Sequence, residues 1–331
     1  MENLSLLRMK FYYPLLLLLI CNSACNNPGN KQNDGEDKDT TKAPVTVDFN
    51  ADSAYAFVKQ QVDFGPRVPG SAGHTQCHNY MSRLLMQYAD TVYFQNTTAI
   101  TYDKHTIPVK NIIASFNPKI SSRILLCAHW DTRPFADQDT KDQDKPILGA
   151  NDGASGVGVL LEIARNLAAK KPLVGIDIVL FDAEDWGDRS GQTEDSYCLG
   201  SQYWAKNLHV PGYKAEFGIL LDMVGAPNAL FGFEDASSNF AGPTLSLVWQ
   251  TAANAGYGNY FRSFDRGGIT DDHVYIMKYA NIPTIDIIDF DPMTESKFGK
   301  YWHTHNDNMD AISKETLKAV GQTLQNVIYN Y

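Results

Sequence analysis

The sequence is poor in positive charge. Lysine and arginine together number 28 against 38 aspartates and glutamates, which leaves a formal net charge of −10 at pH 7. Proteins that bind nucleic acid or anionic lipid through their surface need a basic face, because phosphate groups attract lysine and arginine. The deficit therefore argues against nucleic acid and against an anionic membrane surface as partners of this chain.

The sequence also has no internal repeat and no second segment whose composition would mark another domain. Of the 331 residues, 44% are apolar and 11% are aromatic. After a leader of about forty residues is set aside, the remainder is long enough to bury one large core. We therefore predict a single domain over residues 46–331.

The beginning of the chain lacks an apolar run long enough to cross a membrane comfortably. The run at residues 11–20, FYYPLLLLLI, follows Arg8 and Lys10, and small residues come after it, directly before Cys25. A short apolar run behind positive charges is typical of an export signal. We predict a signal peptide over residues 1–25 and export to the periplasm of a bacterium.

Cys25 stands where bacterial lipoproteins carry their lipid-modified cysteine. The polar segment 26–45 behind it resembles the disordered tether of such proteins. We expect a lipid anchor at Cys25 to be the membrane contact of this chain, and plain cleavage into the periplasm is the alternative. Three cysteines then remain, so at most one disulfide can form among them and one thiol stays free. They are Cys77, Cys127 and Cys198.

Four short apolar runs predict buried parallel strands, because they are rich in Ile, Leu and Val and lack polar alternation. Helical patterns, such as residues 155–170 and 242–256, lie between them, and residues 313–330 predict an amphipathic helix with Ser313 as its N-cap. Alternating strands and helices predict an α/β fold, an open, mostly parallel twisted sheet with helices on both faces. The four runs are residues 123–128, 176–182, 217–223 and 282–290.

Side chains that bind metal follow these runs or lie in the turns beside them. Zn²⁺ is bound by imidazole nitrogen and carboxylate oxygen, and a catalytic zinc keeps one open position beside three protein ligands. In an open parallel sheet, ligands bind outside the carboxyl ends of the strands, where these segments fall. We therefore predict a zinc site at that edge of the sheet. The candidate residues are His129, Asp131, Asp152, Glu184, Asp185, Asp222, Asp271 and His303.

Taken together, the segments LLCAHWD, GANDGASG, FDAEDWG, LLDMVGAP, TDDH and YWHTHND resemble the zinc aminopeptidase family and, within it, the animal-type glutaminyl cyclases. The resemblance covers roughly residues 50–331. It implies a catalytic domain with one zinc ion per chain, bound by Asp152, Asp185 and His303. Glu184 falls on the general acid and base of the cyclases. Asp185 is shorter than the Glu that both families usually carry at its position.

The same resemblance leaves a di-zinc aminopeptidase as the alternative. In the peptidases, His129 and Asp222 fall on the ligands of a second zinc, with Asp152 as the bridge. In the cyclases, Asp222 instead resembles a member of a hydrogen-bonded chain of carboxyl groups. A third interpretation, a silent binding domain on the same scaffold, predicts that metal ligands or Glu184 are lost. The sequence shows neither loss.

Segment 270–273, TDDH, favours the cyclase, because the peptidases usually show Ser-Asp-His there and the cyclases show Asp-Asp-His. If the carboxyl groups of Asp271, Asp222 and Glu184 face one another, they cannot all be ionised, so they share protons and some pKa values rise. We predict that these three residues keep a proton ready for catalysis. A helix cap or a solvated loop acid is the alternative role for Asp271.

Aromatic residues near the predicted site are expected to bind substrate. By resemblance, Trp302, directly before His303, and Phe298 wall a pocket for a small ring-shaped product. Trp186, just after Asp185, is a further candidate for closing another side, although the family's corresponding Trp lies farther along the loop. Plain packing is the alternative role for Trp302. The long polar loop at residues 187–201 is a candidate rim that selects substrates.

The reaction that the resemblance implies converts the amino-terminal Gln of peptides and exported proteins to pyroglutamate and releases ammonia. Zinc would polarise the carbonyl of the side-chain amide, and Glu184 would take a proton from the α-amine and deliver it to the departing ammonia. The sequence leaves open which peptides are processed, the oligomeric state and the occupancy of a second metal site.

Overall fold

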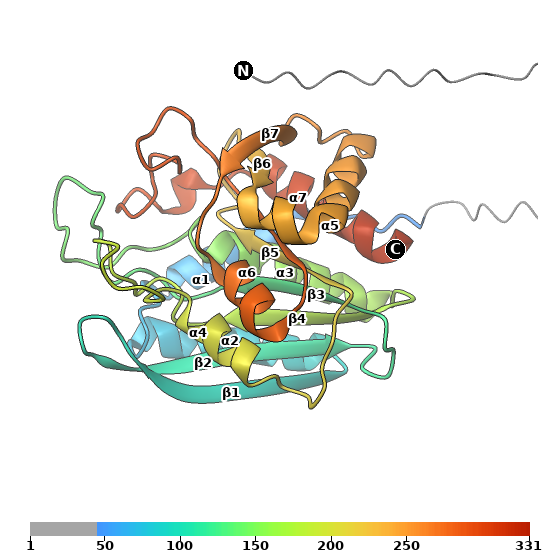
Figure 1. Ribbon diagram of the computed structural model, residues 1–331, viewed down its shortest axis with the longest axis horizontal. Coiled ribbons are helices and arrows are strands. Elements are labelled where there is room, and N and C mark those ends of the chain that lie inside the picture. Colours follow the sequence, from blue (N-terminus) through green and yellow to red (C-terminus); the bar gives the residue numbers. More distant parts are fainter. Residues whose placement is uncertain (1–44) are drawn as a thin grey trace, which may run out of the picture. The chain divides into compact units, whose positions relative to one another are not determined.

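Six strands form the central sheet of the computed structural model, which describes residues 45–331. They lie in the order β1-β2-β4-β3-β5-β8 (Figure 1), and β4, β3, β5 and β8 run parallel to one another. The predicted open, mostly parallel sheet is therefore confirmed. The strands span Thr91–Ile100 (β1), Thr106–Phe116 (β2), Arg123–His129 (β3), Gly175–Phe181 (β4), Phe217–Asp222 (β5) and Thr284–Ile288 (β8).

One edge of the sheet is antiparallel. β2 pairs with β4 in the antiparallel sense, and β1 pairs with β2 along its whole length. Side chains of β1 alternate between half-buried and exposed, as expected of a strand with one face in solvent. Neither strand was among the predicted elements, because this alternation breaks the continuous apolar run that marks the four central strands.

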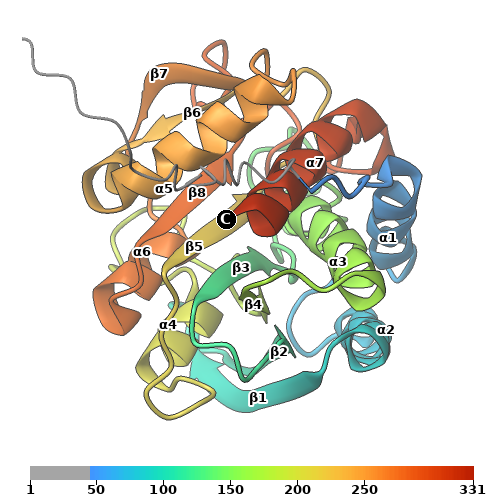
Figure 2. The same cartoon turned by 90° about the vertical axis from the view of Figure 1, so that its right-hand side faces the viewer.

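Helices cover both faces of the sheet (Figure 2). Leu126 and Ala128 of β3 point into the larger core with α1, α2, α3, α5 and α7, whereas Leu125 and Cys127 point into the smaller core with α4. The helices span Ala51–Asp63 (α1), Ala72–Tyr88 (α2), Ala154–Ala169 (α3), Leu199–Lys206 (α4), Asp235–Asn254 (α5), Asp272–Tyr275 (α6) and Lys314–Asn330 (α7), with short turns at Ile276–Ala280 (η1) and Met309–Ala311 (η2).

The predicted helices form, with one difference in length. Ser313 caps α7, since its hydroxyl accepts a hydrogen bond from the backbone N–H of Thr316 at 3.3 Å, as predicted. α5 begins at Asp235 rather than at residue 242. Its backbone is kinked at Ala241, where φ is −132°, and Pro243 begins the second segment. Proline is typical of a first helical turn, so the sequence pattern identified only that second segment.

A small second sheet lies beside β8. Its strands, Phe231–Glu234 (β6) and Phe261–Gly267 (β7), run parallel to each other, and Phe231 forms a bridge with Asp289 just after β8. α5 begins directly after β6. β7 leads into the segment that carries TDDH, so this small sheet positions one wall of the site described below.

The described residues, 45–331, belong to one compact unit. The predicted signal peptide at residues 1–25 and its tether at residues 26–45 lie outside the described residues, apart from Val45. No helix in the described part of the chain has both the length and the apolar character needed to cross a membrane. In the same part, all three cysteines, Cys77, Cys127 and Cys198, are buried free thiols.

Candidate metal centre

The candidate site lies where the parallel strands end at their carboxyl side. His129 is the last residue of β3 and Asp222 is the last residue of β5, while Glu184 follows β4 by a short turn. Asp152 comes directly before α3, and His303 lies in the long connection between β8 and α7. Segments far apart in the sequence therefore meet at one edge of the sheet, as predicted for a doubly covered parallel sheet.

Asp152, Asp185 and His303 form the first donor group. Each offers a ligand atom within 4.8 Å of the others, and none of the three is more than 4% exposed. Nε2 of His303 lies 3.6 Å from Oδ2 of Asp152 and 3.3 Å from Oδ1 of Asp185. Within residues 45–331, Oδ2 of Asp185 has no hydrogen-bond partner. Two buried carboxylates and an imidazole with an unsatisfied oxygen among them match the donor set of a zinc site.

A buried ion-pair chain orients His303. Nδ1 of His303 lies 3.2 Å from Oδ1 of Asp137, and Arg133 donates to both oxygens of Asp137 at 2.9 Å. Nη1 of Arg133 also donates to the backbone oxygen of Asp185 at 2.8 Å. Burial alone would raise the pKa of Asp137, but the hydrogen bonds from His303 and Arg133 outweigh it and hold that pKa well below its usual value. A carboxylate behind a metal-binding imidazole is a common arrangement that fixes the ring.

Asp307 holds the backbone of the turn that carries Asp152. Asp307 accepts hydrogen bonds from the N–H groups of Asn151 at 2.7 Å and Asp152 at 3.0 Å. Burial and the neighbouring Asp152 raise the pKa of Asp307 to about 7. Gly153 completes the turn with φ of +94°, where a Cβ would lie 2.8 Å from the carbonyl oxygen of Asp131. The turn that presents Asp152 therefore requires glycine at position 153.

Asp131 holds the backbone of Glu184 and Asp185, the two neighbouring acids of the FDAEDWG segment. Its carboxylate accepts from the N–H of Glu184 at 3.0 Å and from the N–H of Asp185 at 3.2 Å. Asp185 belongs to the donor group with His303, whereas Glu184 belongs to a different group, with Cys198 and Asp271. The two side chains therefore point to different parts of the site. This arrangement suits a metal ligand at Asp185 and a general acid and base at Glu184.

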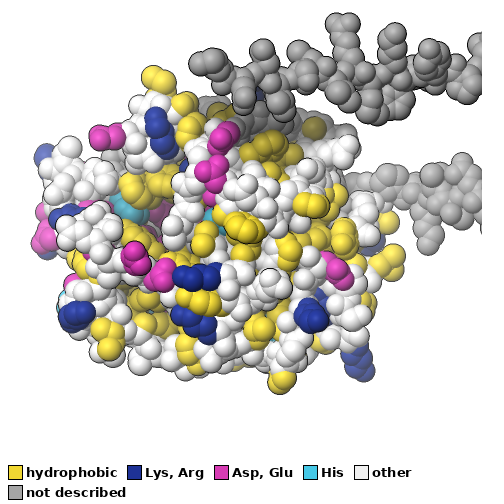
Figure 3. All heavy atoms as spheres, viewed as in Figure 1, with side chains coloured by type: hydrophobic (Ala, Val, Ile, Leu, Met, Phe, Trp, Pro, Cys, Tyr) yellow, Lys and Arg dark blue, Asp and Glu magenta, His cyan; other side chains and the backbone are white. Residues whose placement is uncertain are grey.

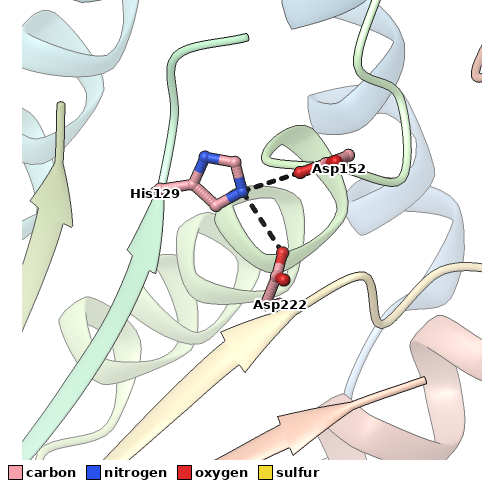
Figure 4. Close-up of side chains that lie close together, drawn as sticks. All are labelled: His129, Asp152 and Asp222. Atoms are coloured by element: carbon pink, nitrogen blue, oxygen red, sulfur yellow. Dashed lines mark hydrogen bonds and ion pairs between the residues drawn. The ribbon is translucent and has the colours of Figure 1, made fainter. Parts of the chain in front are cut away.

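His129, Asp152 and Asp222 form a second donor group that shares Asp152 with the first (Figure 4). Nε2 of His129 lies 3.0 Å from Oδ1 of Asp152 and 3.2 Å from Oδ1 of Asp222. Burial lowers the pKa of His129, but its acidic neighbours Asp131, Asp152 and Asp222 outweigh burial and raise it well above the usual value. A protonated His129 therefore brings a positive charge between Asp152 and Asp222.

Glu184, Asp222 and Asp271 come together as predicted, although their roles in catalysis stay predictions. Burial raises the pKa of Glu184 well above its usual value, and Asp185 and Asp271 raise it further. Burial also raises the pKa of Asp271. The pKa of Asp222 reaches about 7, because burial and Asp271 outweigh its hydrogen bond with His129. These carboxyl groups therefore retain protons at pH values where an exposed carboxyl group is ionised.

Asp271 also fits the alternative role considered for it. Its Oδ1 accepts from the N–H of Asp272 at 2.5 Å, and the residue is the N-cap of α6. It is nevertheless only 5% exposed, which excludes a solvated loop acid. Cys198 adds a contact that the sequence did not indicate, because its thiol donates to Oε1 of Glu184 at 3.3 Å.

A cavity of about 220 Å³ is lined by acids of both groups. Phe298 and Trp302 line it as predicted, and the ring of Trp302 stacks on His303 with a centroid distance of 3.7 Å. Phe298 packs against Trp302 at 4.8 Å. Figure 3 shows histidine and acidic side chains between hydrophobic ones in a recess of this face. The full lining is Asp152, Glu184, Asp185, Tyr197, Asp222, Met223, Ile269, Thr270, Asp271, Ile288, Phe298, Trp302 and His303.

Trp186 lies elsewhere, in contrast to the prediction. Its ring packs against Phe135 at 6.4 Å and His105 at 5.7 Å, and its Nε1 donates to Asp103 at 3.4 Å. The side chain follows Asp185 and points away from the cavity, because the backbone there is held by Asp131 and Arg133. From the polar loop at residues 187–201, Tyr197 lines the cavity instead.

Sequence reasoning missed several residues that support the site. Arg67 is fully buried and donates to the backbone oxygens of Trp130, Leu148 and Gly149. Arg133 and Asp137 were likewise not predicted to support the site. A signal was present for two of them: Arg133 and Asp137 are charged residues within a few positions of His129.

Comparison with known proteins identifies relatives over most of the chain. Residues 111–328 match Peptidase family M28. A Zn-dependent exopeptidase from Parabacteroides distasonis is 51% identical with a TM-score of 0.85, and the match covers 87% of this chain and 100% of that one. A glutaminyl cyclase from Tannerella forsythia is 51% identical with a TM-score of 0.84 over 86% and 100% of the two chains. The glutaminyl-peptide cyclotransferase of Bos taurus is 25% identical over 80% of this chain and 78% of its own length.

Proposed function

The chain belongs to peptidase family M28, and from this premise we propose that it is a zinc-dependent glutaminyl-peptide cyclotransferase. Its substrates are peptides and exported proteins that begin with Gln, and its products are the pyroglutamyl peptide and ammonia. One observation carries the proposal beyond family membership. Asp271 is buried beside Glu184 and Asp222, so the site contains a protonated carboxyl relay next to a small aromatic cavity.

Zinc fits the first donor group. Asp152, Asp185 and His303 would hold the ion, since their donor atoms converge and Oδ2 of Asp185 has no other partner within residues 45–331. Zinc bound there supplies a Lewis acid for the oxygen of the side-chain amide. We expect one ion per chain, because cyclisation uses the amine of the substrate instead of water as nucleophile, so one Lewis acid is sufficient.

Glu184 is positioned to move the proton that cyclisation requires. The α-amine of the substrate attacks its own side-chain amide carbon, a new carbon–nitrogen bond forms, and the bond to the amide nitrogen breaks. Glu184 takes a proton from the α-nitrogen as the new bond forms and returns it to the amide nitrogen, which leaves as ammonia. The raised pKa of Glu184 suits this exchange, because the buried carboxyl group binds a proton more readily than an exposed one.

Phe298 and Trp302 give the cavity its selectivity. Their rings form apolar walls next to the metal-binding His303, in a space of about 220 Å³. A single small ring product fits such a space. The five-membered lactam formed from Gln is flat and compact, so aromatic walls contact it over most of its surface.

A di-zinc aminopeptidase is the second candidate function, and the second donor group favours it. His129, Asp152 and Asp222 converge as ligands of a second ion would (Figure 4). The two functions differ in nucleophile, because a peptidase uses water and a cyclase uses the amine of the substrate. They therefore differ in product as well as in metal content.

The deciding experiment compares two peptides. The purified mature domain is given a peptide that begins with Gln and one that begins with Leu, and both products are followed by mass spectrometry while zinc is counted per chain. We expect the Gln peptide alone to lose one molecule of ammonia, with one zinc bound. Release of free Leu, with two zinc ions, would establish the peptidase instead.

We also propose that the protein is exported to the periplasm and anchored through a lipid on Cys25. The supporting observations are the charged and apolar pattern of residues 1–25 and the polar segment that follows. Labelling of the full-length protein with a radioactive fatty acid is expected to be lost in the variant Cys25→Ala. An unlabelled, soluble periplasmic wild-type protein would favour plain cleavage.

A further inference from the structure

Glu234, in the small second sheet, contacts both flanks of Asp271. It is the last residue of β6 and the N-cap of α5, and its side chain is fully buried. Oε1 accepts from the N–H of Ala236 at 2.9 Å and from that of Ile269 at 3.4 Å. Oε2 accepts from the N–H of Ser237 at 2.7 Å and lies 3.0 Å from Nε2 of His273. One carboxylate therefore joins the start of a helix to the segment that carries Asp271.

The two contacts with that segment lie on opposite sides of Asp271. Ile269 precedes Asp271 by two residues and His273 follows it by two. The side chain of Asp271 has few hydrogen bonds of its own. Its Oδ1 accepts only the neighbouring N–H of Asp272, and within residues 45–331 its Oδ2 has no hydrogen-bond partner. The position of the Asp271 carboxyl group is therefore set by its flanks, and both flanks are bound to Glu234.

We infer that Glu234 is a positioning residue for the reaction, which holds Asp271 against Glu184 through Ile269 and His273. The inference rests on the proposed cyclase function, because it assigns Asp271 to the proton relay. Glu234 lies outside the cavity lining and does not touch the substrate. Glu234 therefore acts on the reaction through the 269–273 segment that it holds.

Charge explains why a carboxylate serves at this position. Burial raises the pKa of Glu234, but the hydrogen bonds from His273, Ala236 and Ser237 outweigh it and lower that pKa to about 2. Glu234 is therefore ionised throughout the pH range of interest and orients the N–H of His273 toward itself. The other titratable groups that act on Asp271 or lie beside it and His273 are His129, Asp152, Glu184, Cys198, Asp222, Asp272 and Asp286.

A simple helix-capping role would not account for these contacts. A cap needs one oxygen near the first free N–H groups of the helix, which Ser, Thr, Asn or Asp also supply. Glu234 offers two oxygens, and each accepts from a cap N–H and contacts the 269–273 segment. The neighbouring Asp235 is exposed and lies in the first turn of the same helix. It provides a matched control for loss of one negative charge at this helix start.

The test is a double-mutant cycle on the zinc-loaded mature domain. Glu234→Gln keeps the size and one acceptor oxygen of the side chain but removes its charge. We expect kcat for a Gln-initiated peptide to fall about tenfold while KM and zinc content stay unchanged, because proton transfer is impaired and binding is not. Asp235→Asn should leave kcat unchanged. In the Asp271→Asn background, Glu234→Gln should cause no further loss, since both substitutions disable the same relay.

Two results would overturn the inference. The first is wild-type kcat in Glu234→Gln, and the second is a full additional loss on top of Asp271→Asn, as expected of an independent structural defect. If Glu234→Gln does not fold, His273→Gln removes the other end of the same hydrogen bond and is read by the same criteria. Failure of the proposed function is distinguishable, because the wild-type protein would then not release ammonia from the peptide at all.

Discussion

Two regions of the site use the same residue types to opposite effect. Around His303, the acids are bound by cations: Asp137 pairs with Arg133 and with His303 itself. Around Asp271, no lysine or arginine within residues 45–331 contacts the acids directly. Both oxygens of Asp286 and one oxygen of Asp271 have no hydrogen-bond partner among these residues. Asp137 in the first region is therefore held ionised, whereas the pKa values of Asp271 and Asp286 in the second are raised.

The difference shows that residue type does not decide the charge state of a buried acid. The side chains of Asp137 and Asp271 are both shielded from water, yet the pKa of the first is lowered and that of the second is raised. Burial raises both pKa values, but the hydrogen bonds from His303 and Arg133 reverse this shift in Asp137, and no guanidinium group within residues 45–331 does so at Asp271. The first region suits a metal ion and the second suits proton transfer, so the two can cooperate across one cavity.

The largest effect is expected from Glu184→Gln, which removes the proton carrier between the two regions. Turnover should fall by about 10²- to 10⁴-fold, while zinc content stays at the wild-type level because Glu184 is not in the donor group of His303. Steady-state kinetics and metal analysis measure both quantities. Glu194→Gln, an exposed position in the same loop, is the control. Full activity in Glu184→Gln would contradict the assigned role.

The next largest effect is expected from Asp271→Ala, which breaks the protonated region alone. Cyclisation should slow by about 100-fold, because Glu184 loses the neighbouring carboxyl group that helps it retain its proton. Aminopeptidase chemistry depends much less on this position. A mild effect on ammonia release, together with release of free Leu from a Leu-initiated peptide, would therefore point to the peptidase.

Asp137→Ala tests the ionised region. Zinc affinity should fall by about 10- to 100-fold, because the ring of His303 loses the carboxylate that orients it. Competition with a chelator gives the affinity, and activity should return at high zinc concentration. The control is Asp144→Ala, an exposed acid of the same loop. Unchanged affinity in Asp137→Ala would show that Arg133 and the backbone suffice to place His303.

The smallest effect is expected in the pH dependence of stability in zinc-free protein. The pKa of Asp307 is raised to about 7 in the folded state, above its value of about 4 in the unfolded state. The native state then binds the proton more tightly, so this contribution to the free energy of unfolding is complete below about pH 4 and is lost as pH rises toward 7. Thermal melts should show a flatter dependence over this window in Asp307→Asn. An unchanged slope would contradict the raised pKa.

Much of the central fold was predictable from the sequence. Strands β3, β4, β5 and β8 are buried on both faces, so each appears as a continuous apolar run, and the alternation with helices determines a parallel sheet. His129 and Asp222 end two of those strands and Asp185 follows a third closely, whereas Asp152 and His303 lie farther along the connections. Their convergence then follows from the geometry of parallel strands, whose carboxyl ends share one edge.

Other elements carry no comparable local signal. The strands β1, β6 and β7 contain exposed or half-buried side chains, which weakens the apolar pattern. The contacts of Glu234 with Ile269 and His273, and of Asp307 with Asp152, join residues that are far apart in the sequence. A carboxylate in a turn has the same sequence appearance whether it faces water, a backbone N–H or a metal.

The sequence by itself therefore determined the fold class, the edge of the sheet where the site forms and the residues able to bind metal, because these follow from local patterns repeated at strand ends. Only the tertiary structure decided the rest. It separated Glu184 from Asp185, directed Trp186 away from the cavity and paired Asp137 with His303. The reason is physical: side-chain direction and charge state depend on the partners that folding brings within a few ångströms, and those partners come from distant parts of the chain.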